Sequence, residues 1–147
     1  MMNNSGALAI TGIVTRGYGI ASGSHGTLQK QWPAFLEAHI PVDEYYQGTI
    51  NVLFSNVRLL RNCPTYTISN FKWDSTRAPE SFAFFRCYIR FNTKGYIGCL
   101  EYYPIPVDER QLRRRENMIE LICPFISEII YGSEVDILLP DVCYVVS

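Results

Sequence analysis

Two aromatic-rich segments on either side of a short polar turn constrain the fold of this chain more than any other feature. Ser81–Phe91 and Tyr96–Tyr103 are rich in aromatic and β-branched residues, and Asn92-Thr93-Lys94-Gly95 separates them. This arrangement predicts an antiparallel hairpin, with Gly95 at the turn position that most requires a positive φ. The centre of the chain is therefore expected to be antiparallel β-structure.

Shorter segments continue this pattern on both sides of the hairpin. Each is rich in β-branched or other apolar residues and is bounded by Gly, Pro, Asn or Ser, as strands typically are. The further strands expected are Leu8–Thr15, a strand entered through a turn within Gln47–Leu53, one short strand within Asn62–Pro79, Met118–Cys123 and Glu134–Leu139.

Two segments have helical rather than strand spacing. The first runs from Lys30 to a stop at Pro41, with Pro33 in its first turn, and the second is Phe125–Tyr131, about two turns long. Six or seven short strands and two small helices, without regular βαβ alternation, predict a mainly β, mostly antiparallel barrel.

The composition fits one domain over residues 1–147, because 48% of the residues are hydrophobic and no linker or repeat interrupts the chain. Thirteen Lys and Arg against 14 Asp and Glu give a net charge of -1, which provides no general attraction for nucleic acid or an anionic membrane. No apolar run approaches the ~20 residues that span a bilayer.

The amino-terminal segment and the cysteines predict a cytoplasmic protein. Met1–Thr11 lacks the basic start and apolar run of a secretory signal. The five cysteines form no C-x-x-C pair, and several lie in apolar runs where thiols behave as small core residues. A reduced environment follows from this pattern.

A glycine-rich segment, Gly17–Gly26, follows the first strand and contains four glycines in ten residues. Closely spaced glycines let backbone N–H groups converge on a phosphate. The segment matches neither the dinucleotide-binding fingerprint nor a Walker loop. Considered alone, it is more typical of a surface loop.

Thr49 and Asn51 lie two residues apart at the start of a strand. This spacing places both side chains on one face, about 6 to 7 Å apart along the chain. Two neutral oxygens suffice for Mg²⁺ only when substrate phosphates supply the negative charge. The alternative is a pair of polar residues at a strand entry, without a metal.

Glu120 lies in an apolar strand, where alternation groups it with Met118 and Ile122. A carboxylate on an apolar face needs a partner or a function. Desolvation would favour its neutral form, which suits a proton acceptor or a ligand contact. A salt bridge at the barrel edge is the alternative.

Arg110 and Arg113–Arg115 resemble a phosphate clamp, but three acidic residues in the same segment favour a solvated loop face. His25 and His39 are the only histidines, and no Cys or His lies at ligand spacing from them. A structural zinc or a Cys-His nucleophile is therefore not expected, whereas His25 is a minor candidate for phosphate contact.

Three blocks in this order resemble the archaeal-type CTP-dependent riboflavin kinases, which are small cradle-loop β-barrels. Gly12–Ala21 resembles the family's opening strand and nucleotide loop, Gly48–Val52 its G-T-L-N motif, and Met118–Pro124 its I-I-E-I-I-A-P segment. The resemblance covers residues 10 to 53 and 96 to 140.

The resemblance implies a role for each block. Thr49 and Asn51 would bind Mg²⁺, and Glu120 would contact the flavin. A proton-acceptor role for Glu120 is our own inference. The residues implied in nucleotide binding are Gly17, Tyr18, Gly19, Ile20, Ala21 and Ser22, together with Ile126, Ser127, Glu128 and Ile129.

Two functions are consistent with these residues. The first is phosphoryl transfer from a cytidine nucleotide to riboflavin or a related small alcohol, and the intact Thr49 and Asn51 favour it. The second is a non-catalytic barrel that binds a nucleotide or flavin. Ile20 and Ala21, which replace a Glu and a Gly of the family, and the loss of basic residues in Ile126–Ile129 favour the second. Small molecules are the expected partners in both.

Overall fold

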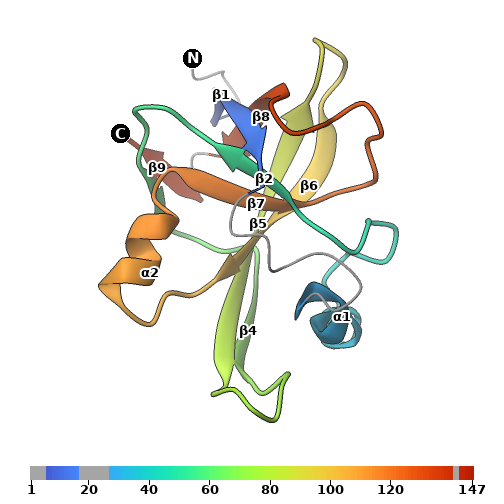
Figure 1. Cartoon of the computed structure of the whole chain (residues 1–147), viewed down its shortest axis with the longest axis vertical. Helices are drawn as coiled ribbons and strands as arrows, with labels where there is room; N and C mark the ends of the chain where they lie inside the picture. The colour runs from blue at the N-terminus through green and yellow to red at the C-terminus, as the bar shows by residue number, and fades with distance from the viewer. Residues whose placement is uncertain (1–5, 17–26, 141–142) are drawn as a thin grey trace.

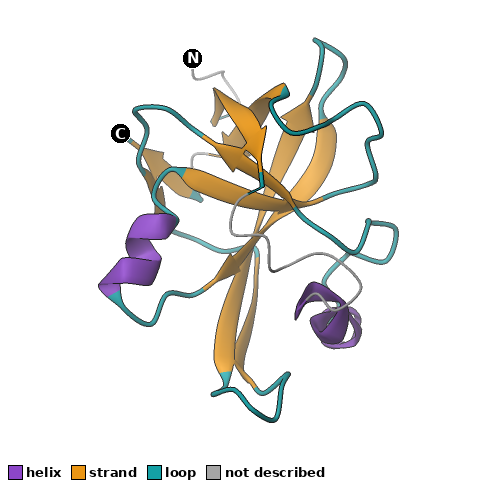
Figure 2. Ribbon diagram, in the orientation of Figure 1, coloured by secondary structure: helices purple, strands orange, loops and turns teal. Residues whose placement is uncertain are grey.

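The computed structural model describes residues 6–16, 27–140 and 143–147, in which strands predominate and two helices lie at the periphery (Figure 2). The elements are β1 (Ala7–Thr15), α1 (Thr27–Glu37), β2 (Ile50–Leu53), β3 (Leu59–Arg61), β4 (Tyr66–Phe71), β5 (Glu80–Arg90), β6 (Ile97–Pro104), α2 (Glu109–Arg114), β7 (Met118–Ile122), β8 (Glu134–Pro140) and β9 (Tyr144–Val146).

Six strands close into an antiparallel barrel in the order β5-β6-β7-β2-β1-β8. Closure comes from the pairing of β8 with β5, in which Ile89 lies opposite Ile137. At Gly12, β1 approaches β2 so closely that a Cβ atom would lie 2.5 Å from Cγ1 of Val52. The predicted mainly β, mostly antiparallel barrel with two short helices is confirmed.

β4 is an additional strand that pairs with the first half of β5 outside the closed barrel. Figure 1 shows this hairpin extending away from the barrel, with α1 and α2 on opposite sides of it. The aromatic ring of Phe35 on α1 packs edge-on against Phe84 of β5, with centroids 5.0 Å apart. The α1 face of the sheet therefore has a second hydrophobic core besides the barrel interior.

β7 is buried on both faces because it separates these two cores. Ile119 and Leu121 belong to the barrel core, whereas Ile122 belongs to the α1 core. Alternation along the strand therefore places Glu120 on the outer face of the barrel with Ile122, one of the two residues with which the sequence pattern groups it. The outcome is a buried carboxylate on an otherwise apolar strand.

A buried ion pair connects β3, which pairs with β9, to β6 of the barrel. Arg61 of β3 donates to both oxygens of Glu101 on β6, with Nε 3.2 Å from Oε1. The Tyr144 hydroxyl of β9 donates to the same carboxylate at 2.8 Å, and the Arg61 guanidinium lies 4.4 Å from the Tyr103 ring centroid. Burial tends to lower the pKa of Arg61, but the Glu101 charge outweighs it and raises that pKa.

α1 begins earlier than its spacing predicts, so Pro33 lies inside the helix rather than in its first turn. Its C-terminus is a Schellman motif, in which Ile40 N–H donates to the Phe35 carbonyl and His39 N–H to the Leu36 carbonyl, each at 3.0 Å. His39 adopts a φ of 61° there. One of the two histidines therefore has a structural role.

Three local predictions are wrong. Phe125–Tyr131 forms turns rather than a helix, with i→i−3 backbone bonds such as Ile129 N–H to the Ile126 carbonyl. A helix this short gains too few bonds to offset nucleation unless a cap supports it, as Asp108 does for α2. The second helix is α2, within the segment expected to be a charged loop. In the hairpin turn, Asn92 and Thr93 have the positive φ angles instead of Gly95, since Asn tolerates this region well.

Four cysteines are buried and all five are free thiols, which confirms the predicted core role of several of them. Neither of the helices in the described ranges is long and apolar enough to cross a membrane.

Candidate functional site

A cavity of about 500 Å³ opens where β1 ends, β2 begins and the segment after β7 crosses between them. Thr49 and Asn51 line it from the entry of β2, and Ile126 and Ile129 line it from the segment after β7. Arg16 contributes from the end of β1, immediately before the glycine-rich segment. Residues more than 70 positions apart in the sequence thus share one cavity.

β-Pairing explains how the polar side chains come together. Asn51 of β2 lies directly opposite Glu120 of β7 in the antiparallel register. Thr49, two residues before Asn51, lies on the same face and donates its hydroxyl to Oε2 of Glu120 at 3.3 Å. Glu120 itself does not line the cavity, so its connection to the cavity runs through Thr49.

The Glu120 carboxylate is held by an ion pair with Arg115, which follows α2. Desolvation raises the pKa of this carboxyl above its ordinary value of 4.5, and the Arg115 charge and the Thr49 hydroxyl oppose that rise. Of the two alternatives for Glu120, the salt bridge is present in the structure. The raised pKa of Glu120 is also consistent with the expected effect of desolvation on this carboxyl.

Thr49 and Asn51 have oxygens that fit a magnesium ion accompanied by phosphates. Nδ2 of Asn51 donates to the Arg16 carbonyl at 3.4 Å, which leaves Oδ1 as the amide's acceptor atom. The Thr49 hydroxyl donates a hydrogen bond to Glu120, and its oxygen retains lone pairs that can bind a metal. A magnesium ion held by these two oxygens would offset negative charge on phosphate groups. Among the described residues, no three His, Cys, Asp or Glu side chains gather as a metal site.

Exposed aromatic side chains surround the mouth of the cavity. Tyr46 and Phe125 pack with ring centroids 5.4 Å apart, and the guanidinium of Arg16 lies 4.9 Å from the ring centroid of Tyr131. All three aromatic side chains are more than half exposed. Aromatic faces next to a cation and two polar oxygens suit a planar ligand that also has polar or anionic groups.

The structure brings together only part of the set predicted from the sequence. Thr49, Asn51, Ile126 and Ile129 line the cavity, whereas Ser127 and Glu128 do not. Glu128 instead pairs with Lys94 at 3.3 Å on the exposed surface. Gly17, Tyr18, Gly19, Ile20, Ala21 and Ser22, and also His25, lie outside the described residues.

Sequence analysis missed several residues of this region. Tyr46, Phe125 and Tyr131 lie outside the helices and strands, and their proximity depends on long-range pairing. Arg115 was part of the recognised arginine run, but its pairing with Glu120, five residues later, was not foreseen. The local signal was a carboxylate in an apolar run only five residues after the last arginine of a run of cations.

The chain matches no protein-family model and no curated protein sequence.

Proposed function

We propose that this protein is a phosphotransferase similar to the CTP-dependent riboflavin kinases, which transfers a phosphoryl group from a cytidine nucleotide to riboflavin or a related small alcohol. One observation carries the proposal. Thr49 and Asn51, assigned to Mg²⁺ by resemblance, line the same cavity as Ile126 and Ile129, which the resemblance assigns to the nucleotide. Residues implicated by separate sequence blocks thus converge on one place.

The side chains that line the cavity suit both a nucleotide and a flavin. Phosphoryl transfer depends mainly on positioning and on charge stabilisation. Asn51 and Thr49 provide metal-binding oxygens, and Arg16 provides a fixed positive charge for phosphate. The exposed rings of Tyr46 and Phe125 offer apolar faces on which a planar base or flavin can stack.

Glu120 favours a second candidate, a barrel that binds the same ligands without catalysis. Its carboxylate is engaged by Arg115 and Thr49 and does not line the cavity. A general base must come within about 3 Å of the proton it removes, or act through one water. Catalysis by Glu120 would therefore require the Arg115 ion pair to rearrange.

The decisive experiment incubates the purified protein with riboflavin, Mg²⁺ and, in separate reactions, CTP, UTP, GTP and ATP. Chromatography then measures flavin mononucleotide. We expect product with CTP in a Mg²⁺-dependent reaction. Flavin binding without product from any donor would reject the kinase and favour the binding barrel.

Variants of the two metal-binding candidates test where the reaction occurs. Thr49→Val and Asn51→Leu each remove an oxygen at nearly constant volume. We expect each variant to fold and to lose most of the Mg²⁺ dependence of nucleotide binding. Unchanged Mg²⁺ dependence in both variants would reject this assignment, whatever the activity assay shows.

A further inference from the structure

The two side chains assigned to Mg²⁺ are neutral, so their orientation decides whether they can bind a metal. Within the described residues, no Asp or Glu lines the cavity at β2. A neutral hydroxyl or amide binds a cation only when a lone pair, rather than an O–H or N–H bond, faces the ion. The Asn51 amide is oriented by the Arg16 carbonyl, to which its Nδ2 donates at 3.4 Å. Thr49 is oriented by a different group.

The two carboxylate oxygens of Glu120 have different partners. Oε1 accepts from Nη1 of Arg115, and Oε2 accepts from the Thr49 hydroxyl at 3.3 Å. A carboxylate that pairs with a guanidinium offers acceptor atoms only, so Thr49 must be the donor of its bond. The hydroxyl proton of Thr49 is therefore directed at Glu120, and the lone pairs of the oxygen remain for a ligand in the cavity.

Arg115 is fixed through its backbone as well as its side chain. Its N–H donates to the Leu112 carbonyl at 3.1 Å, where α2 ends, and its carbonyl accepts from Nη1 of Arg61. The Arg115 side chain is largely buried and does not line the cavity at β2. Among the described residues, its connection to that cavity runs through Glu120 and Thr49.

We propose that Arg115 is a positioning residue of the Mg²⁺ site and fixes the direction of the Thr49 hydroxyl through Glu120. The proposal rests on the binding of Mg²⁺ by Thr49 and Asn51 in the proposed function. Groups that orient a metal ligand from behind typically change metal affinity by about 10- to 100-fold. Because the Arg16 carbonyl orients Asn51 independently, loss of Arg115 affects one of the two ligands. The effect should therefore lie near the lower end of that range.

The test measures binding of Mn²⁺ to the full chain in the presence of CTP, with Mn²⁺ as a paramagnetic replacement for Mg²⁺. Electron paramagnetic resonance gives the affinity for Mn²⁺, and calorimetry gives the affinity for CTP without metal. No acceptor alcohol is present, so the result does not depend on phosphoryl transfer. We expect Arg115→Met to weaken Mn²⁺ binding by about tenfold and metal-free CTP binding by less than about twofold.

Two further variants keep the test independent of the folding of Arg115→Met, and circular dichroism checks that each is folded. Arg115→Lys retains a charge that can hold one oxygen of Glu120, so most of the Mn²⁺ affinity should be retained. Glu120→Gln introduces an amide that can donate to Thr49 as well as accept from it, so the direction of the hydroxyl is no longer fixed. We expect Glu120→Gln to weaken Mn²⁺ binding about as much as Arg115→Met does.

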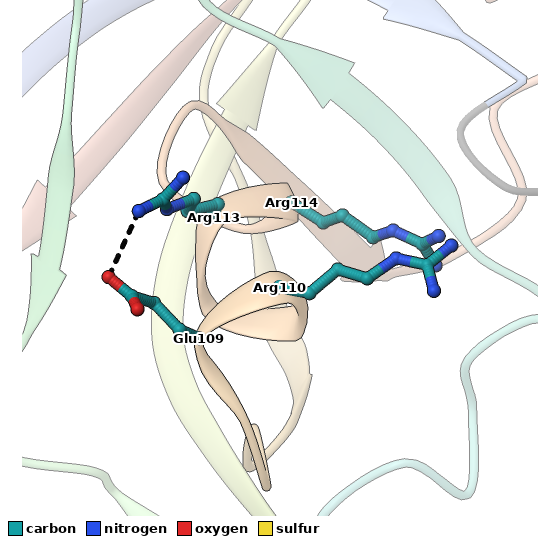
Figure 3. A pocket seen from close by; sticks show the side chains of 4 residues that line it. All are labelled: Glu109, Arg110, Arg113 and Arg114. Atoms are coloured by element: carbon teal, nitrogen blue, oxygen red, sulfur yellow. Dashed lines mark hydrogen bonds and ion pairs between the residues drawn. The ribbon is translucent and has the colours of Figure 1, made fainter.

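Arg113→Met is the matched control, because Arg113 forms an ion pair with a glutamate on the same short helix. Figure 3 shows this pair, in which Arg113 lies 3.1 Å from Glu109. Both side chains are exposed, and the surface cavity that they line shares no lining residue with the cavity at β2. Arg113→Met should therefore change the affinity for Mn²⁺ by less than about twofold.

The double variant Arg115→Met/Thr49→Val tests whether Arg115 acts through Thr49. It should bind Mn²⁺ no more weakly than Thr49→Val alone, because the oxygen that Arg115 positions is already absent. If Thr49→Val weakens Mn²⁺ binding, additive losses in the double variant, or unchanged or tighter binding by Arg115→Met, would overturn the positioning role and leave the metal site standing. An unaltered chain that binds no Mn²⁺, or a Thr49→Val variant that binds it equally well, would overturn the metal assignment and this proposal together.

Discussion

Two Arg–Glu ion pairs on neighbouring strands have the same chemistry and different surroundings. Glu101 of β6 points into the barrel, where the side chains of Arg61 and Glu101 are 6% and 0% exposed. Glu120 of β7 points to the outer face, where Arg115 and Glu120 are 17% and 9% exposed. Arg61 also donates to the Arg115 carbonyl, so the two pairs are connected through the backbone.

The Arg61–Glu101 ion pair, called the inner pair below, makes several further contacts. Besides each other, its members contact the Tyr144 hydroxyl, the Met118 carbonyl at 2.9 Å and the Tyr103 ring. Among the described residues, the outer pair, Arg115–Glu120, has Thr49 as a further side-chain partner, and Thr49 lines the cavity. The inner pair is therefore enclosed within the barrel, whereas the outer pair is connected to the cavity through Thr49.

Replacement of Arg61 should have the largest effect. Arg61→Met leaves Glu101 buried without its charge partner, and breaking such a pair costs about 3 to 5 kcal/mol. Urea denaturation monitored by circular dichroism measures this loss. The double variant Arg61→Met/Glu101→Gln should recover much of it, because no buried charge remains. A single-variant loss below about 1 kcal/mol would contradict the structural role of the inner pair.

Arg115→Met breaks the outer pair and should cost less, about 1 to 3 kcal/mol, because Glu120 can become protonated. Loss of the Arg115 charge removes an influence that lowers the pKa of Glu120, so this pKa should rise further. The loss of stability should therefore be small below pH 4.5 and grow as the pH increases. Denaturation at several pH values measures it, and a loss independent of pH would show that the pair contributes packing alone.

The sequence was sufficient to predict most of the barrel, because its strands have strong local patterns. The Ser81–Phe91 and Tyr96–Tyr103 segments correspond closely to β5 and β6, and Met118–Cys123 to β7. The wrong predictions of the two helical segments came from local sequence patterns that were weak or misleading. The apolar spacing of Phe125–Tyr131 mimics a helix, whereas the Asp108–Gln111 capping interaction was overlooked within a charged run.

The two ion pairs show why the candidate site was only partly predictable. Glu120 was identified from its apolar neighbours, and Glu101, which follows Cys99 and Leu100, has the same signal. Neither signal reveals the partner. Arg61 reaches Glu101 across 40 residues because β3 pairs with β9, and no local pattern predicts that pairing.

The variant Glu120→Gln tests how the outer pair makes folding stability depend on pH. The folded pKa of Glu120 is raised above 4.5, so the folded state binds more protons than the unfolded state between the two pKa values. Its contribution to stability is therefore present at low pH and decreases as the pH rises through the folded pKa. Glu120→Gln should abolish this decrease, whose slope is at most about 1.4 kcal/mol per pH unit. Parallel stability curves for the two proteins would exclude a raised pKa.

Thr49→Val should have the smallest effect on stability, about 0.5 to 1.5 kcal/mol, because it removes one hydrogen bond at nearly constant volume. That bond lowers the pKa of Glu120, so its loss should raise this pKa by less than Arg115→Met does. Titration of the Glu120 side-chain carboxyl by ¹³C NMR measures both shifts. Thr49→Ser keeps the hydroxyl and should leave the pKa close to that of the unaltered chain. A Glu120 pKa that responds to Arg115→Met but not to Thr49→Val would show that the outer pair is isolated from the cavity, as the inner pair is.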